Sequence, residues 1–125
     1  MNKEHIFNFS VAYADTDAFG IMYHARYIEV AERARMNWSK NVKIPDGDSG
    51  FVVRDLNIKY LHPLLVGEEF VVCTVPIKIG MASMTIEQKF MQKDKICAIM
   101  NITIAYLGKD MRPKAIPESI TKMLV

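Results

Sequence analysis

The chain opens on a stretch in which apolar and polar residues alternate. From residue 6 to residue 13, Phe7, Phe9 and Val11 occupy one phase, and polar or small residues occupy the other. Successive side chains of a strand point to opposite faces, so this alternation predicts a half-buried β-strand. A short acidic turn follows, and Gly20 near its end gives the backbone the conformational freedom that a tight turn needs.

The next segment has helical spacing. Between residues 23 and 40, apolar side chains recur at i, i+4, i+7 and i+11, namely Tyr27, Ala31, Ala34 and Trp38. These positions form one apolar stripe, and its two alanines would let a sheet approach the helix backbone closely. We expect an amphipathic helix over residues 23–40, followed by a loop that contains Pro45.

Four further stretches have strand character, over residues 51–61, 69–79, 83–93 and 96–107. Pro76 lies on the opposite phase to its apolar neighbours, which indicates an edge, a bulge or a bend. Both phases of the last stretch are largely apolar, so we expect a central strand that is covered on both faces. Pro117 suits the first turn of a short C-terminal helix.

This order of elements predicts an α+β protein with one strand, one long helix and four strands in hairpin succession. We expect a five-stranded antiparallel sheet packed around the helix, in a single domain over residues 1–125. The sheet would keep an unpaired edge and an apolar second face. Pairing with a second copy would cover both, so we expect a homodimer or a larger assembly such as a homotetramer.

Composition narrows the class of protein. The formal charge of +2 is small, and no basic stripe with interleaved aromatic residues appears, so a nucleic-acid partner is not expected. Cys73 and Cys97 each lie in an apolar run without metal-binding spacing, which predicts buried free thiols in a reducing compartment. The N-terminus lacks a signal-peptide pattern, and no apolar run has membrane-spanning length, so we expect a cytoplasmic protein without a membrane span.

The acidic turn contains the strongest candidate chemistry. A carboxylate such as Asp17 can act as a nucleophile or as a general base on water, although aspartate is also a common capping residue in turns and helices. Asp15 is expected to hydrogen-bond the backbone of the turn. A calcium loop counted from Asp15 would need oxygen ligands at its fifth position and a glutamate at its twelfth. Phe19 and Arg26 occupy those positions, so calcium binding is not expected.

Four more residues complete the candidate site. His24 lies near the expected start of the helix, where its backbone N–H could stabilise an oxyanion and its side chain could orient water or substrate. Gly20, Tyr23 and Tyr27 are candidates for substrate binding, with Tyr23 either a pocket wall or a hydrogen-bonding group. His5 and His62, by contrast, are expected to be surface or loop residues rather than catalytic ones.

The motif as a whole resembles the hotdog-fold 4-hydroxybenzoyl-CoA thioesterase family, and within it the YbgC-type acyl-CoA thioesterases. The residues that carry this resemblance are Asp15-Thr16-Asp17, Gly20, Tyr23-His24, Tyr27, Glu32-Arg33-Ala34-Arg35 and Trp38. They extend over about 25 positions, and the later run Phe51-Val52-Val53-Arg54 is also similar. Ala14, where many relatives carry an acidic residue, and Ile28 depart from the pattern without touching the chemistry.

The resemblance implies a specific reaction. It implies hydrolysis of acyl-CoA without a metal or other cofactor, with Asp17 as the catalytic carboxylate and the His24 N–H as the donor to the thioester oxygen. For the anionic end of CoA, the candidates are Lys59, Lys78, Lys89 and Arg54. Two other functions stay open, namely a hotdog dehydratase and a hotdog protein that binds acyl-CoA or acyl carrier protein without catalysis.

Overall fold

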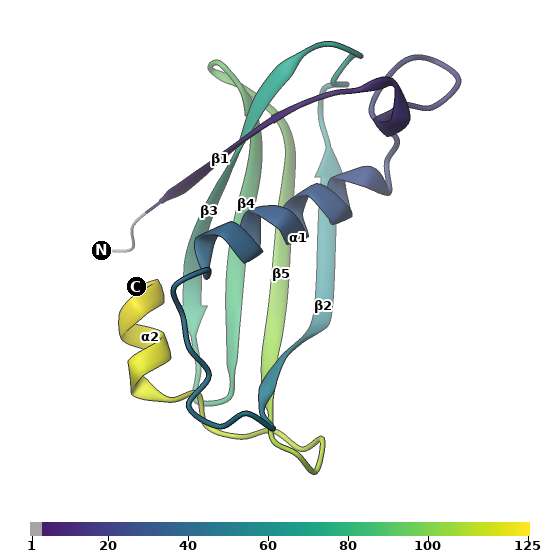
Figure 1. Cartoon of the computed structure of the whole chain (residues 1–125). Coiled ribbons are helices and arrows are strands. Elements are labelled where there is room, and N and C mark those ends of the chain that lie inside the picture. Colours follow the sequence, from purple (N-terminus) through teal and green to yellow (C-terminus); the bar gives the residue numbers. More distant parts are fainter. Residues whose placement is uncertain (1–3) are drawn as a thin grey trace.

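The computed structural model describes residues 4–125 and contains one antiparallel sheet with two helices (Figure 1). Its elements in chain order are β1 (His5–Ser10), the 3₁₀ turn η1 (Tyr13–Asp15), α1 (Arg26–Trp38), β2 (Gly50–Tyr60), β3 (Glu69–Ile79), β4 (Ser83–Gln92), β5 (Lys95–Leu107) and α2 (Glu118–Leu124). Within the described residues, neither helix is long and apolar enough to cross a membrane.

The strands form a single sheet in the order β1-β3-β4-β5-β2. The predicted hairpin succession is confirmed for β3, β4 and β5 but is wrong for β2, which pairs antiparallel with β5 at the far edge. The cause is the segment 61–68, which does not turn tightly into β3 but crosses from one side of the sheet to the other. β5 therefore lies between β4 and β2, as the apolar character of both its phases predicted.

The predicted irregularity at Pro76 is a register shift in the pairing of β3 with β4. A proline has no backbone N–H to donate to a ladder, so within strands it is commonly found at such irregular positions.

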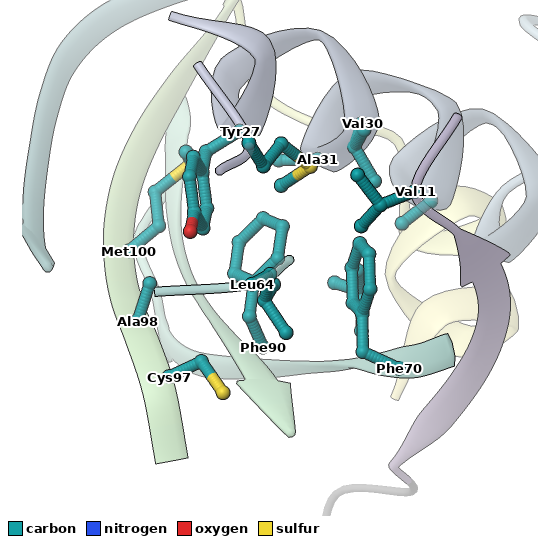
Figure 2. Close-up of a cluster of buried hydrophobic side chains, with 13 residues drawn as sticks. Val11, Tyr27, Val30, Ala31, Leu64, Phe70, Phe90, Cys97, Ala98 and Met100 are labelled. Carbon is teal, nitrogen blue, oxygen red and sulfur yellow. The ribbon is translucent and has the colours of Figure 1, made fainter. Parts of the chain in front are cut away.

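Helix α1 lies across one face of the sheet, and the sheet curves around it (Figure 1). This is the hotdog fold that the sequence resemblance implied. Tyr27, Val30 and Ala31 are buried on the side of α1 that faces the sheet (Figure 2), and Ala34 is buried in the same cluster. The helix is shorter than predicted, because the Tyr23 N–H donates to the Asp15 carbonyl and keeps residues 23–25 in a non-helical turn.

A buried polar cluster fixes α1 on the sheet. Gln88 of β4 has no exposed surface, and its amide nitrogen donates to the Ala31 carbonyl and to Thr74 Oγ1, both at 3.0 Å. Its amide oxygen accepts a hydrogen bond of 2.9 Å from Arg35. Every side-chain hydrogen-bonding atom of Gln88 is thus engaged at least once, which a fully buried amide needs.

The C-terminal helix α2, predicted from Pro117, covers a second apolar cluster beyond the end of α1 (Figure 1). Ile120 and Leu124 of α2 pack there with Tyr106 and with Trp38 from the last turn of α1. Elsewhere in the sheet, Cys73 and Cys97 are buried free thiols, as the sequence predicted.

Candidate active site

The acidic turn is built on Asp15. Its Oδ2 accepts a hydrogen bond of 2.8 Å from the Ala12 N–H, and its Oδ1 lies 3.3 Å from Arg26 Nε at the start of α1. The Asp15 side chain is only 12 % exposed. The expected backbone hydrogen bond is confirmed, and the ion pair additionally joins the turn to the helix.

Asp17 lies two residues further on, in a tight turn of its own. Its N–H donates to the Ile21 carbonyl at 2.9 Å, and its carbonyl accepts the Gly20 N–H at 3.0 Å. Gly20 has a φ of +77°, a conformation that favours glycine. The Phe19 N–H donates to Asp17 Oδ1 at 2.9 Å, whereas Oδ2 accepts no hydrogen bond from residues 4–125. One carboxylate oxygen is thereby oriented by the turn, and the other is left for a ligand.

The segment 61–68, which follows β2, packs alongside this turn. The Leu64 carbonyl accepts the Met22 N–H at 2.7 Å, and the Gly20 carbonyl accepts the Val66 N–H at 3.1 Å. These backbone hydrogen bonds fix the two segments relative to each other, although more than forty residues separate them in the sequence.

Between the turn and this segment opens a cleft of about 390 Å³. The residues that line it are Asp17, Ile21, Met22, His24, Tyr27, Tyr60, Leu61, His62 and Pro63. The structure therefore brings together three of the five predicted site residues, Asp17, His24 and Tyr27. The other two, Gly20 and Tyr23, do not line the cleft. Gly20 shapes the turn, and the half-exposed ring of Tyr23 lies 4.4 Å from the His24 ring, between centroids.

His24 lies just before α1 rather than inside it. Its carbonyl accepts a hydrogen bond of 2.7 Å from the Tyr60 hydroxyl at the end of β2. Its N–H donates to no acceptor within residues 4–125. The His24 N–H is therefore a free donor, and the peptide group that follows it is held by Tyr60, an arrangement that suits an oxyanion site.

Two tyrosines line the cleft, a buried one, Tyr27, and a half-exposed one, Tyr60. The rings of Tyr27 and Tyr60 meet edge to face at 5.1 Å between centroids. Figure 2 shows the Tyr27 side chain reaching from α1 toward the sheet. Burial raises the pKa of Tyr27 to about 12, and burial also raises the pKa of Tyr60. Both phenols are therefore neutral near pH 7.

No cysteine, lysine or arginine of the described residues lines this cleft beside Asp17. Burial raises the pKa of the Cys97 thiol, which disfavours a thiolate. None of the four basic residues predicted to contact CoA lines the cleft, and Lys89 lies 3.6 Å from Glu87 instead. Within residues 4–125, no group of three or more His, Cys, Asp or Glu side chains is arranged to hold a metal ion.

A larger groove of about 1430 Å³ lies between β1, the start of β3 and the β4–β5 hairpin. It shares no residue with the cleft. None of the five predicted site residues lines it, so we place the candidate site in the smaller cleft.

Sequence reasoning missed Tyr60 and His62 as members of the cleft. His62 is an exposed loop residue, as expected. It nevertheless lies on the wall of the cleft. The sequence shows only that His62 directly precedes Pro63 at the end of a strand. This position indicates a role in the site only when the segment 61–68 is known to pack on the Asp17 turn.

Comparison with known proteins decides the family. Residues 11–124 match the thioesterase-like superfamily. The chain belongs to this superfamily. This thioesterase-like protein is 31 % identical over 118 residues to the acyl-CoA thioesterase YbgC of Haemophilus influenzae. The alignment covers 88 % of this chain and 86 % of the relative.

Solved structures of similar shape carry related names. A probable thioesterase from Bartonella henselae superposes with a TM-score of 0.81 at 26 % identity, covering 92 % of this chain and 98 % of the other. The probable thioesterase YbaW from Escherichia coli gives a TM-score of 0.89 at 20 % identity, covering 97 % and 99 %. The second likeness supports the fold of this thioesterase-like protein and no more.

Proposed function

We propose that this thioesterase-like protein hydrolyses acyl-CoA thioesters to free CoA and a carboxylic acid. The observation that carries the proposal is the placement of Asp17 and His24 in one cleft, where a carboxylate oxygen and a backbone N–H both lack partners within residues 4–125. The relatives named acyl-CoA thioesterase support the substrate class.

In this proposal, Asp17 is the catalytic carboxylate. Acting as a general base, it takes a proton from water while the water oxygen bonds to the thioester carbon. Acting as a nucleophile, it forms a mixed anhydride that water then hydrolyses. In both routes the carbon–sulfur bond breaks and CoA leaves as the thiol, and no metal or cofactor is needed.

His24 acts through its backbone N–H, which donates to the oxygen that becomes negative in the tetrahedral intermediate. One such donor typically contributes about 10²–10³ in turnover. Tyr60 holds the His24 carbonyl through its hydroxyl, and Tyr27 forms part of the acyl wall. Gly20 and Tyr23 support the site indirectly, Gly20 through the turn and Tyr23 through its contact with the His24 ring.

The cleft favours a compact acyl group, either short-chain or aromatic. Its volume of about 390 Å³ is near the lower end of ligand pockets. The Tyr27 and Tyr60 rings offer flat apolar surfaces on which an aromatic acyl group can pack.

We also propose that the protein assembles as a homodimer or homotetramer. β2 is an edge strand, and its Val52 and Val53 are exposed. Phe19, beside the cleft, is 88 % exposed. An unpaired edge with exposed apolar side chains is a surface that a second copy would cover. Light scattering that gives the mass of one chain would contradict assembly.

A panel of acyl-CoA substrates, read out by release of free thiol, tests the reaction. We expect thiol release from short-chain or aromatic acyl-CoA. Binding of acyl-CoA without thiol release would favour the non-catalytic alternative. Addition of water to an enoyl thioester without thiol release would favour the dehydratase, although dehydratases place the acidic residue on the helix, whereas Asp17 precedes α1.

A further inference from the structure

The wall of the cleft opposite the Asp17 turn carries a second imidazole at a rigid position. The Leu61 and His62 N–H groups both donate to the Cys97 carbonyl, at 2.8 and 3.1 Å. Pro63 follows and restricts the backbone of His62 to extended conformations. Leu64, next in the chain, is fully buried. The backbone of His62 is therefore fixed, while its side chain is exposed.

The titratable groups that line the cleft are Asp17, His24, Tyr27, Tyr60 and His62. They come from the acidic turn, the residues before α1, α1 itself, the end of β2 and the segment after β2. No lysine or arginine lines the cleft. Burial disfavours ionisation of both phenols, and the imidazoles are the nitrogen-bearing side chains here that can donate a proton to a ligand.

The two imidazoles are placed differently. The His24 ring contacts Tyr23, which lies outside the cleft lining. The His62 side chain makes no hydrogen bond, ion pair or ring contact with residues 4–125. The ring nitrogens of His62 are thus available to a ligand in the cleft.

We propose that His62 is the general acid that protonates the departing CoA sulfur. This role rests on the proposed hydrolysis. The water oxygen bonds to the carbonyl carbon as its proton passes to Asp17. When the carbon–sulfur bond breaks, the sulfur keeps the electron pair and takes a proton from the His62 imidazolium. The proton held by Asp17 then returns to His62 through solvent, which restores both groups.

The test compares two leaving groups in His62→Ala. CoA is an alkyl thiol, whose thiolate is a basic leaving group that departs more readily when its sulfur is protonated. A nitrothiophenol leaves readily as a thiolate without protonation. With the same acyl group on both, we expect kcat/KM to fall about 10²-fold for the CoA thioester, the low end of general-acid contributions. For the aryl thioester, we expect little change. Equal losses on the two thioesters, or no loss on either, would overturn the proposal.

His62→Gln separates proton transfer from hydrogen bonding. Glutamine donates a hydrogen bond but transfers no proton, so we expect the same loss as in His62→Ala, and recovery with glutamine would overturn the role. The alkaline limb of the pH profile of kcat/KM on the CoA thioester should also differ between the wild type and His62→Ala, because only the wild type carries this proton donor. A limb that is identical in the two proteins counts against the proposal.

His5→Ala is the matched control, because the His5 ring bonds to Asn37 outside the cleft. We expect its leaving-group ratio to equal that of the wild type. Circular dichroism and the melting temperature verify that each variant is folded. A wild-type protein that releases no thiol would refute the hydrolysis as well, whereas an active wild type with a fully active His62→Ala would refute the role of His62 alone.

Discussion

The two ends of α1 are built in opposite ways. At its N-terminal end, the Asp17 turn and the segment 61–68 leave a cleft open, and polar atoms on its wall have no partner within residues 4–125. At its C-terminal end, Trp38 packs into the cluster that α2 closes, and Ile120 of that helix is 1 % exposed. One helix thus joins an open polar site to a closed apolar cluster.

The comparison is sharpest between two tyrosines. The Tyr60 hydroxyl, at the open end, donates to the His24 carbonyl. The Tyr106 hydroxyl, at the closed end, is buried without a hydrogen-bond partner among the described residues. The hydrogen bonds of the open end hold the groups of the proposed site in position, whereas the closed end is held by apolar packing. Substitutions at the two ends should separate stability from activity.

The largest loss of stability is expected from Ile120→Ala. Removing this buried side chain from the closed cluster should lower the free energy of unfolding by about 2–5 kcal/mol. The kcat/KM of the protein that remains folded should not change. Urea unfolding measures the loss, and Met123→Ala, at an exposed position of the same helix, should stay within about 0.5 kcal/mol of the wild type. A parallel loss of kcat/KM would show that the two ends are coupled.

A smaller effect on stability is expected from Tyr60→Phe. The substitution removes one hydrogen bond to the His24 carbonyl, which should cost about 1 kcal/mol of unfolding free energy. It also releases the peptide group that directly follows the proposed oxyanion donor, so kcat should fall while KM changes less. Steady-state kinetics on one acyl-CoA separates the two constants. An unchanged kcat would mean that this hydrogen bond does not position the site.

The smallest effect is expected from Tyr106→Phe, the same substitution at the closed end. Because the hydroxyl lacks a partner within the described residues, removing it should leave the free energy of unfolding unchanged or raise it by up to about 1 kcal/mol. Activity should be that of the wild type. Chemical denaturation provides the measurement, and a clear loss of stability would reveal a hydrogen bond to this hydroxyl, for example from buried water.

Local patterns predicted the elements well because their causes are local. The alternation in β3 and β5 and the stripe from Tyr27 to Trp38 are properties of neighbouring residues, and the ranges agree within a few positions. The helix start was misplaced by three residues, because the Tyr23 N–H bonds to Asp15 instead of starting α1. The pairing of β2 with β5 was missed because strand pairing depends on contacts between distant segments.

The same division holds for the candidate site. Asp17, His24 and Tyr27 are near one another in sequence, so one motif could indicate all three. Tyr60 and His62 reach the cleft only through the backbone hydrogen bonds that join residues 20–22 to residues 64–66. No periodicity or spacing in the sequence encodes those bonds.

The proposed reaction depends most directly on the Asp17 carboxylate, and Asp17→Asn tests it. The amide keeps the shape of the side chain but is neither a base nor a nucleophile, so we predict a fall in kcat/KM on acyl-CoA of about 10³-fold, within the range of general-base contributions. The melting temperature should stay near that of the wild type. Asp15→Asn, two residues away, keeps an oxygen for the Ala12 N–H and should retain most of the activity. Wild-type turnover by folded Asp17→Asn would contradict the account.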